Sequence, residues 1–196
     1  MGIGAAGSAA SFFPNHRPWC TMGGGENMEL LWAPWRGEYV GKEQPPGCIL
    51  CQKPREGNDA ANYLLARGDH AYVLLNLYPY NNGHLMVAPY RHVGELEELL
   101  PQEWQETVSF LTRAVAALKE AYRPHGFNLG VNLGRVAGAG VPGHLHWHVV
   151  PRWEGDANFM PVIGRTRVLP EFLETTYARL RPIWERLARA QEPEIR

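Results

Sequence analysis

The chain has 196 residues, 45% of them hydrophobic, and its formal net charge at pH 7 is −1. That is ample apolar material for the core of one domain of ordinary to large size. The near-neutral charge argues against a broad surface for nucleic acid or membrane. No apolar run approaches the roughly 20 residues that cross a bilayer.

The N-terminal segment differs in composition from the rest of the chain. Residues 1–27 are rich in Gly, Ala and Ser and lack the basic region of a secretory signal. Aromatic content begins abruptly after Met28, in the segment 29–36. We therefore expect residues 1–28 to be a tail that is disordered or not always made, and residues 29–196 to form a single domain.

Short apolar runs bounded by turn residues predict five strands. Gly68-Asp69 separates the first two runs and is typical of a hairpin turn. A glycine-rich loop, 134–143, joins the last two. The predicted strands are 63–66, 71–76, 84–89, 127–133 and 144–150.

Two segments predict helices. Residues 101–122 carry apolar side chains at positions 104, 108, 111, 115, 118 and 122, a spacing typical of one helical face, and Pro101 suits the first turn. Pro170 opens a last helical region, which we expect to break before Pro182. An α+β domain accommodates these elements most economically, with an antiparallel sheet of about five strands, one long helix and a C-terminal helical region.

Three histidines stand at alternate positions of the last predicted strand: His144, His146 and His148. Alternate side chains of a strand leave the same face, so the three rings should line up. Core packing does not call for adjacent buried imidazoles, which are costly unless paired. Imidazole suits a nucleophile, a proton carrier or a metal ligand near neutral pH. We favour an active site over a pure metal site or a chance run.

These residues resemble the histidine triad family. Histidine alternating with apolar residues over 144–150 is similar to the family's triad, and Asn76 with His84 eight positions later resembles its nucleotide-binding strand. The likeness runs from about Trp32 to Trp153. The segments 77–81 and 151–159 resemble the branch that contains diadenosine-tetraphosphate phosphorylases.

The resemblance assigns roles to the histidines. His146 would be the nucleophile that attacks the α-phosphate of a nucleotide and becomes covalently nucleotidylated. It must attack as the neutral ring, with a carbonyl setting its tautomer. His148 would contact the phosphate, and His84 would help to position it from the neighbouring strand.

Nucleotide contacts follow from the same resemblance. Asn76 would bind the ribose hydroxyls, Asn132 would lie on the phosphate side, and backbone N–H groups of Gly138, Ala139 and Gly140 would approach the phosphate. Without the adjacent histidines, the loop would equally be a flexible hairpin. The chain departs from the family in one respect: residues 140–143 offer no hydroxyl or amide side chain for the leaving group.

The three cysteines include one C-x-x-C pair, Cys48 and Cys51, which does not suggest a disulfide framework. This usage fits a reducing cytosol, so a cytoplasmic location is expected. The pair alone is open to a zinc half-site, a redox pair or unused thiols. The resemblance favours zinc, with His92 and His144 completing a closed, structural Cys₂His₂ site.

The sequence thus predicts an enzyme that transfers or hydrolyses a nucleotidyl group, with an adenine dinucleoside polyphosphate as the preferred substrate class. Orthophosphate or water would accept the nucleotidyl group, which gives a phosphorylase or a hydrolase. The resemblance implies a homodimer or higher homo-oligomer. The alternatives are a zinc-stabilised nucleotide-binding module with little turnover and, last, transfer to a sugar phosphate.

Overall fold

A computed structural model of the chain describes residues 47–156 and 171–191. The expected tail over residues 1–28 and the expected start of the domain at residue 29 lie outside these ranges. No helix in the described ranges combines the length and the apolar character that crossing a membrane requires.

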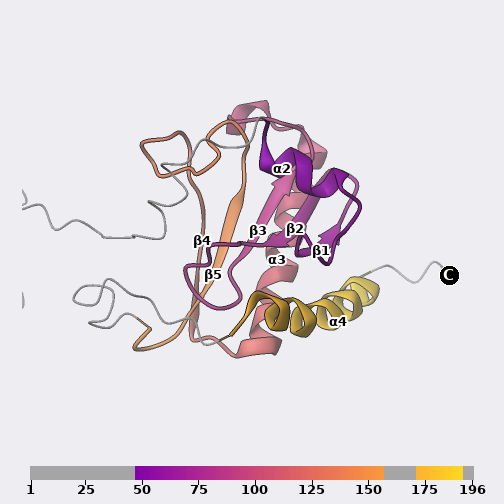
Figure 1. The fold of residues 1–196 in the computed structure, drawn as a ribbon, viewed down its shortest axis with the longest axis vertical. Helices are drawn as coiled ribbons and strands as arrows, with labels where there is room; N and C mark the ends of the chain where they lie inside the picture. Colours follow the sequence, from indigo (N-terminus) through magenta and orange to yellow (C-terminus); the bar gives the residue numbers. More distant parts are fainter. Residues whose placement is uncertain (1–46, 157–170, 192–196) are drawn as a thin grey trace, which may run out of the picture. The chain divides into compact units, whose positions relative to one another are not determined.

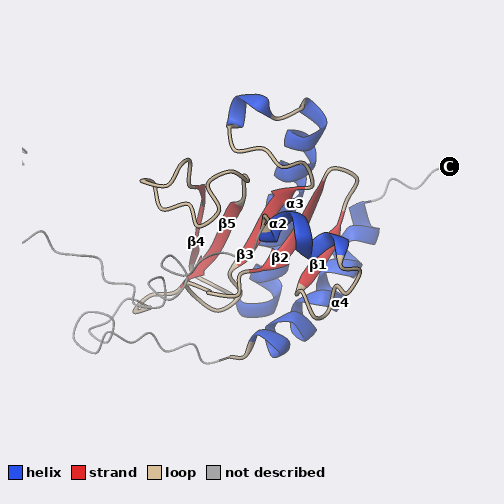
Figure 2. Ribbon diagram, turned by 45° about the horizontal axis from the view of Figure 1, so that its top comes forward, coloured by secondary structure: helices blue, strands red, loops and turns tan. Residues whose placement is uncertain are grey.

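One antiparallel sheet of five strands organises the described residues, in the order β1-β2-β3-β5-β4 (Figures 1 and 2). Gly68 and Asp69 turn the chain between the first two strands, as the sequence predicts. β4 and β1 form the two edges. The strands are β1 (Leu64–Arg67), β2 (Ala71–Leu75), β3 (Leu85–Pro89), β4 (Gly126–Val131) and β5 (Trp147–Arg152).

The helices divide between the two faces of the sheet, as the turned view shows (Figure 2). α3 (Pro101–Tyr122) and α4 (Leu173–Gln191) cover one face and pack on each other. The short α2 (Ile49–Gln52) and the 3₁₀ turn η1 (Lys53–Arg55) lie on the opposite face, and a second 3₁₀ turn, η2 (Leu96–Glu98), precedes α3. The predicted α+β class and five-stranded antiparallel sheet are confirmed.

The long helix has the predicted bounds, but its buried stripe is rotated from the predicted one. Of the six apolar positions expected to face the core, only Leu118 is buried, and Trp104 and Val108 are 47% and 42% exposed. The buried face instead carries Phe110, two alanines and two polar residues. Small alanines let the helix approach the sheet closely, and the spacing of large apolar residues does not predict this.

The expected break before Pro182 is wrong, because α4 continues through it to Gln191. Leu180 and Trp184, on either side of the proline, are both buried, and Trp184 meets Phe110 of α3 edge-on at 5.7 Å between ring centroids. Packing on both sides therefore outweighs the missing backbone donor.

A group of three hydrogen bonds joins the β1–β2 turn to α3. The Glu106 carboxylate accepts hydrogen bonds from the backbone N–H groups of Asp69, His70 and Ala71, at 3.0, 2.6 and 2.6 Å. A Cβ on Gly68 would lie 2.3 Å from Glu106 Oε1, so only glycine admits the carboxylate this closely.

Candidate active site

The pleat of β5 sorts its side chains between the two faces of the sheet. Trp147 and Val149 belong to the core under α3, whereas His148 is paired with Met86 and faces the side of α2. The strand begins at Trp147, so His144 and His146 lie in the extended segment just before it, rather than inside a strand that starts at residue 144. His146 and His148 still adjoin, with 5.1 Å between ring centroids.

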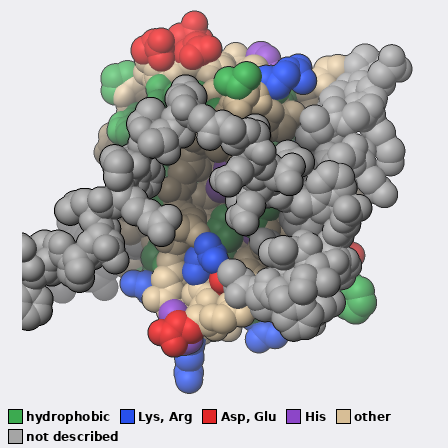
Figure 3. All heavy atoms as spheres, turned by 90° about the vertical axis from the view of Figure 1, so that its left-hand side faces the viewer, with side chains coloured by type: hydrophobic (Ala, Val, Ile, Leu, Met, Phe, Trp, Pro, Cys, Tyr) green, Lys and Arg blue, Asp and Glu red, His purple; other side chains and the backbone are tan. Residues whose placement is uncertain are grey.

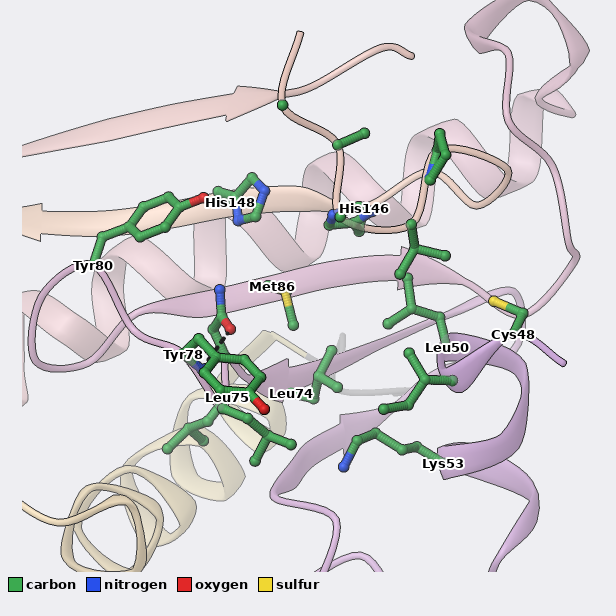
Figure 4. Close-up of a pocket in the computed structure, with 18 of the residues that line it drawn as sticks. Cys48, Leu50, Lys53, Leu74, Leu75, Tyr78, Tyr80, Met86, His146 and His148 are labelled. Carbon is green, nitrogen blue, oxygen red and sulfur yellow. Dashed lines mark hydrogen bonds between the residues drawn. The ribbon is translucent and has the colours of Figure 1, made fainter. Parts of the chain in front are cut away.

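The two rings open into a cavity of about 400 Å³. In Figure 3, histidine surface is visible inside the hollow near the centre of the view. The walls come from α2, from β2 and the loop after it, and from the loop 134–143 (Figure 4). The predicted nucleotide-binding residues Asn76, Gly138, Ala139 and Gly140 line it, and so do several residues that the sequence did not single out: Leu50, Lys53, Leu74, Tyr78, Tyr80 and Met86.

The tautomer of His146 follows from its hydrogen bond. Its Nδ1 lies 2.8 Å from the carbonyl oxygen of His144, and a carbonyl only accepts, so Nδ1 carries the proton. Nε2 therefore holds a lone pair. The ring is 5% exposed, and this burial lowers its pKa, which keeps it uncharged at neutral pH. An uncharged imidazole with one lone pair is a competent nucleophile.

A chain of hydrogen bonds sets the tautomer of His148 in the same way. The backbone N–H of Tyr80 donates to His84 Nδ1 at 3.1 Å, which leaves the His84 proton on Nε2. That Nε2–H donates to His148 Nδ1 at 3.0 Å, and His148 then carries its own proton on Nε2. His84 is 1% exposed, and burial, followed by the charges of His148 and His146, holds its pKa well below 6.5. We call this chain the histidine relay: Tyr80 N–H, His84, His148.

His84 is not among the residues that line the cavity, so it acts through His148. The Tyr80 ring lies over both members of the pair, with centroids 4.6 Å from His84 and 5.7 Å from His148. Asn76 adds a second contact to the relay, because its Nδ2 lies 3.4 Å from His84 Nδ1. The predicted nucleotide-binding and positioning residues therefore meet at one point.

A charged cluster anchors the loop that carries Tyr80. Asn81 Nδ2 donates to Pro151 O at 3.1 Å and to Asp156 Oδ2 at 2.8 Å, which ties the loop to the end of β5. Arg152 binds both oxygens of Asp156, at 2.6 and 2.7 Å. The Arg152 guanidinium holds the pKa of Asp156 at about 2. The sequence offered no sign of this cluster beyond the family likeness of residues 151–159.

The loop 134–143 contributes residues to the lining of the cavity. Gly138 has φ +89°, a conformation that residues with a side chain rarely adopt. Asn132, predicted to contact phosphate, does not line the cavity; its Nδ2 contacts Gly138 O at 3.5 Å and so supports the loop. Arg135, on the same loop, also lines the cavity.

The four predicted metal ligands also come together, beside the cavity. Ligand atoms of Cys48, Cys51, His92 and His144 all lie within 4.8 Å of one another. His144 Nδ1 is 3.3 and 3.4 Å from the two Sγ atoms, and His92 Nδ1 is 3.4 Å from that of Cys51. Two thiols and two imidazoles form a donor set suited to a tetrahedral ion.

His144 is oriented for this role. Its Nε2–H donates to the carbonyl of Pro89 at 2.8 Å, which leaves the Nδ1 lone pair toward the thiols. Burial lowers its pKa to about 4, so the ring is uncharged at neutral pH. The same residue lends its own carbonyl to His146. The His144 side chain thus belongs to the cysteine–histidine cluster, and its backbone carbonyl binds the His146 ring.

Comparison with known proteins agrees with this geometry. Residues 59–155 match the model of the HIT domain. The chain is 43% identical over 173 residues to a Mycobacterium tuberculosis protein named AP-4-A phosphorylase, across 84% of this chain and 89% of that one. The chain belongs to the HIT family.

Solved structures of HIT proteins share the fold. A hypothetical histidine triad nucleotide-binding protein from Sulfolobus tokodaii superposes with a TM-score of 0.61 at 27% identity, over 75% of this chain and 98% of that one. A Zn-bound histidine triad family protein from Mycobacterium smegmatis gives 0.60 at 25% identity, over 74% and 98%. The sequence-based assignment to the family is confirmed.

Proposed function

We propose that the protein is a nucleotidyl transferase that cleaves a dinucleoside polyphosphate through a covalent intermediate on His146. One observation carries the proposal: the His146 Nδ1–H···O bond to His144, which leaves the Nε2 lone pair toward the cavity. The relatives' printed names, AP-4-A phosphorylase and, over 82 residues, a fission-yeast bis(5'-nucleosyl)-tetraphosphatase, support this substrate class. The first of these names also supports adenine as the base.

In the first step, His146 Nε2 attacks the α-phosphorus of the substrate. A P–N bond forms while the P–O bond to the remaining polyphosphate breaks, and the leaving group takes the electron pair. Because Nδ1 keeps its proton, the nucleotidylated ring is positively charged, and the carbonyl of His144 stabilises that charge. His148 Nε2–H donates to the phosphoryl group, and the backbone of the Gly138–Gly140 segment, which lines the same cavity, offers further N–H donors.

In the second step, an acceptor oxygen attacks the same phosphorus, the P–N bond breaks, and Nε2 regains its lone pair. With orthophosphate the product is a nucleoside diphosphate, and with water it is the monophosphate and a released proton. Both acceptors reach the same intermediate. The acceptor therefore decides between phosphorylase and hydrolase without any change in the first step.

The test is incubation with diadenosine tetraphosphate, with and without orthophosphate, and with mass spectrometry of the quenched protein. We expect an adenylyl adduct on His146 when the acceptor is limiting, and ADP as a product when orthophosphate is present. The His146→Ala variant should lose turnover and still bind nucleotide. An unlabelled residue 146 throughout the wild-type reaction, or full turnover in the variant, would refute the assignment.

Zinc is the ion we propose for the cysteine–histidine cluster. The Cys₂His₂ donor set, the second hydrogen bond of His144 and the Zn-bound relative from M. smegmatis support it. Four protein ligands close the site, so zinc would stabilise the fold without supplying an open position for chemistry. A dithiol site persists in a reducing compartment, which supports a cytoplasmic location.

We also propose that the protein is a homodimer joined along β4 and the start of α3. β4 is an edge strand, and Leu129 on it is 50% exposed. Leu129 is paired with Val149, so it lies on the face that α3 covers, and Trp104 of α3 contacts Trp147 on the same face. An edge strand that pairs on one side only among residues 47–156 and 171–191, and that carries an exposed apolar side chain, is a surface that pairing with a second copy would bury. Leu129→Lys should shift the sedimentation mass toward the monomer; an unchanged mass would contradict this interface.

A nucleotide-binding module with little turnover is the second candidate. The stretch 140–143, which has no hydroxyl or amide side chain beside the triad, favours it. Nucleotide binding without any product from diadenosine tetraphosphate would select this alternative.

A further inference from the structure

A lysine stands in the wall of the cavity, at the end away from the histidines. Lys53 is the first residue of η1 and is 9% exposed. Figure 4 draws it beside Leu50 and across from Tyr78, whereas His146 and His148 lie at the other end. Apart from Lys53, the side chains at this end are chiefly apolar: Leu50, Leu74, Leu75 and Tyr78. The proposed phosphoryl chemistry does not use this ammonium.

The position of Lys53 is fixed by Asn62, which is itself buried. Lys53 Nζ donates to Asn62 Oδ1 at 3.3 Å, and Asn62 Nδ2 donates to the Lys53 carbonyl at 3.3 Å and to Glu56 at 2.6 Å. Burial lowers the pKa of the ammonium, and the Glu56 carboxylate opposes that effect. An ammonium has three N–H donors. Among the described residues Asn62 accepts one of them, and the cavity lies beside the others.

The proposed function sets which part of a substrate reaches Lys53. With the α-phosphate at His146 and the ribose at Asn76, the nucleobase enters the end of the cavity lined by Leu50, Leu74 and Tyr78. These side chains offer the ring apolar contacts, which do not tell one purine from another. Lys53 has donors and no acceptor, so it distinguishes bases by the acceptors on their edge.

We propose that Lys53 is a specificity-determining residue that donates to the acceptor edge of a purine base, and that it favours a 6-oxopurine over adenine. A 6-oxopurine presents two adjacent acceptors, N7 and O6, whereas adenine presents N7 beside the N6 amino donor. The ammonium can bridge the first pair and is repelled by the second group. The inference rests on the proposed function for the orientation of the nucleotide and departs from it on the base: guanine nucleotides are substrates at least as good as adenine nucleotides.

The test compares inosine and adenosine 5′-monophosphates, which differ in the group at position 6, by isothermal titration. In wild type we expect inosine monophosphate to bind about ten- to a hundredfold more tightly, the range of one hydrogen bond to a charged group. Lys53→Met should bring the ratio of the two dissociation constants near one. Leu50→Ala is the matched control, since it should weaken both ligands and leave the ratio unchanged.

Lys53→Gln guards against a variant that does not fold, because its amide can donate or accept and should also give a ratio near one. Equal binding of the two nucleotides by wild type, no binding of either, or a preference that persists in both Lys53 variants would overturn the inference. Turnover of diadenosine tetraphosphate separates the two proposals. Turnover without a Lys53-dependent ratio removes only the base-reading role, and a Lys53-dependent ratio without turnover removes only the catalytic proposal.

Discussion

Replacing His84 by leucine tests the histidine relay directly. His84 Nε2–H donates to His148 Nδ1 at 3.0 Å and so keeps the His148 proton on Nε2, where it faces the phosphoryl group. Leucine removes that donor and leaves His148 able to place its proton on Nδ1. In that tautomer Nε2 presents a lone pair to a negatively charged phosphate instead of a donor.

The lost interaction is a hydrogen bond to a charged group, worth about 1.5–3 kcal/mol. If it operates mainly in the transition state, the rate of adduct formation on His146 falls about ten- to a hundredfold. Nucleotide affinity should change little, because His84 does not line the cavity. The backbone N–H of Tyr80 also loses its acceptor, so the variant should lose about 1–3 kcal/mol of stability.

The assay is single-turnover formation of the nucleotidyl adduct, with nucleotide affinity and thermal unfolding measured in parallel. His84→Gln is the matched control, since its amide N–H can donate to His148 and should restore part of the rate. A His84→Leu rate within threefold of wild type would show that His148 needs no partner to hold its tautomer. A large loss of affinity with an unchanged rate would place His84 in binding instead.

Four further predictions follow from the described contacts. Burial lowers the pKa of His146, so adduct formation should be level at pH 7–8 and fall only below about pH 6.5; a rate that already falls between pH 8 and 7 would contradict a neutral nucleophile. Because the pKa of His84 is lowered in the folded state, the unfolded chain takes up its proton first as the pH falls through 6.5, and denaturant titrations should show lower stability at pH 5 than at pH 8. Chelation, or Cys48→Ser, should lower the melting temperature more than it lowers the single-turnover rate, and an unchanged melting temperature in both would argue against a bound metal. Glu106→Ala leaves three backbone N–H groups of the β1–β2 turn without their acceptor and should cost about 1–3 kcal/mol in the free energy of unfolding, while Glu120→Ala on the same helix should cost much less.

The five strands and the bounds of α3 follow from features that a sequence displays. Short apolar runs bounded by turn residues predict five strands, and the helical spacing of apolar residues over 22 positions predicts the bounds of α3. The predicted helix break at Pro182 and the predicted buried face of α3 are wrong for the same reason: both depend on which residues pack against the helix. Trp184 and Leu180 are buried on either side of the proline in α4, and the buried face of α3 includes Ala114 and Ala117 in place of most of the predicted larger apolar residues.

The site was predictable where one segment carries the chemistry. His146 and His148 stand two residues apart, and the family likeness supplied His84 and the metal cluster, which the structure brings together. Lys53 and Asp156 were not predictable, because an isolated charge in a sequence does not reveal that a cavity or a neighbouring loop will enclose it. Asn132 is the opposite case: it was predicted to lie on the phosphate side, but it contacts Gly138 of the loop and does not line the cavity.

His144 contributes through two parts that respond differently to substitution. Its ring belongs to the cysteine–histidine cluster, and its main-chain oxygen accepts a hydrogen bond from His146, the proposed nucleophile. Every amino acid brings a main-chain oxygen, whereas few bring a ligand for a soft cation. Relatives could therefore exchange the side chain here, forgo the ion, and still present a nucleophilic nitrogen to phosphorus. The proposed metal site and the proposed reaction therefore lie side by side but depend on different atoms of His144.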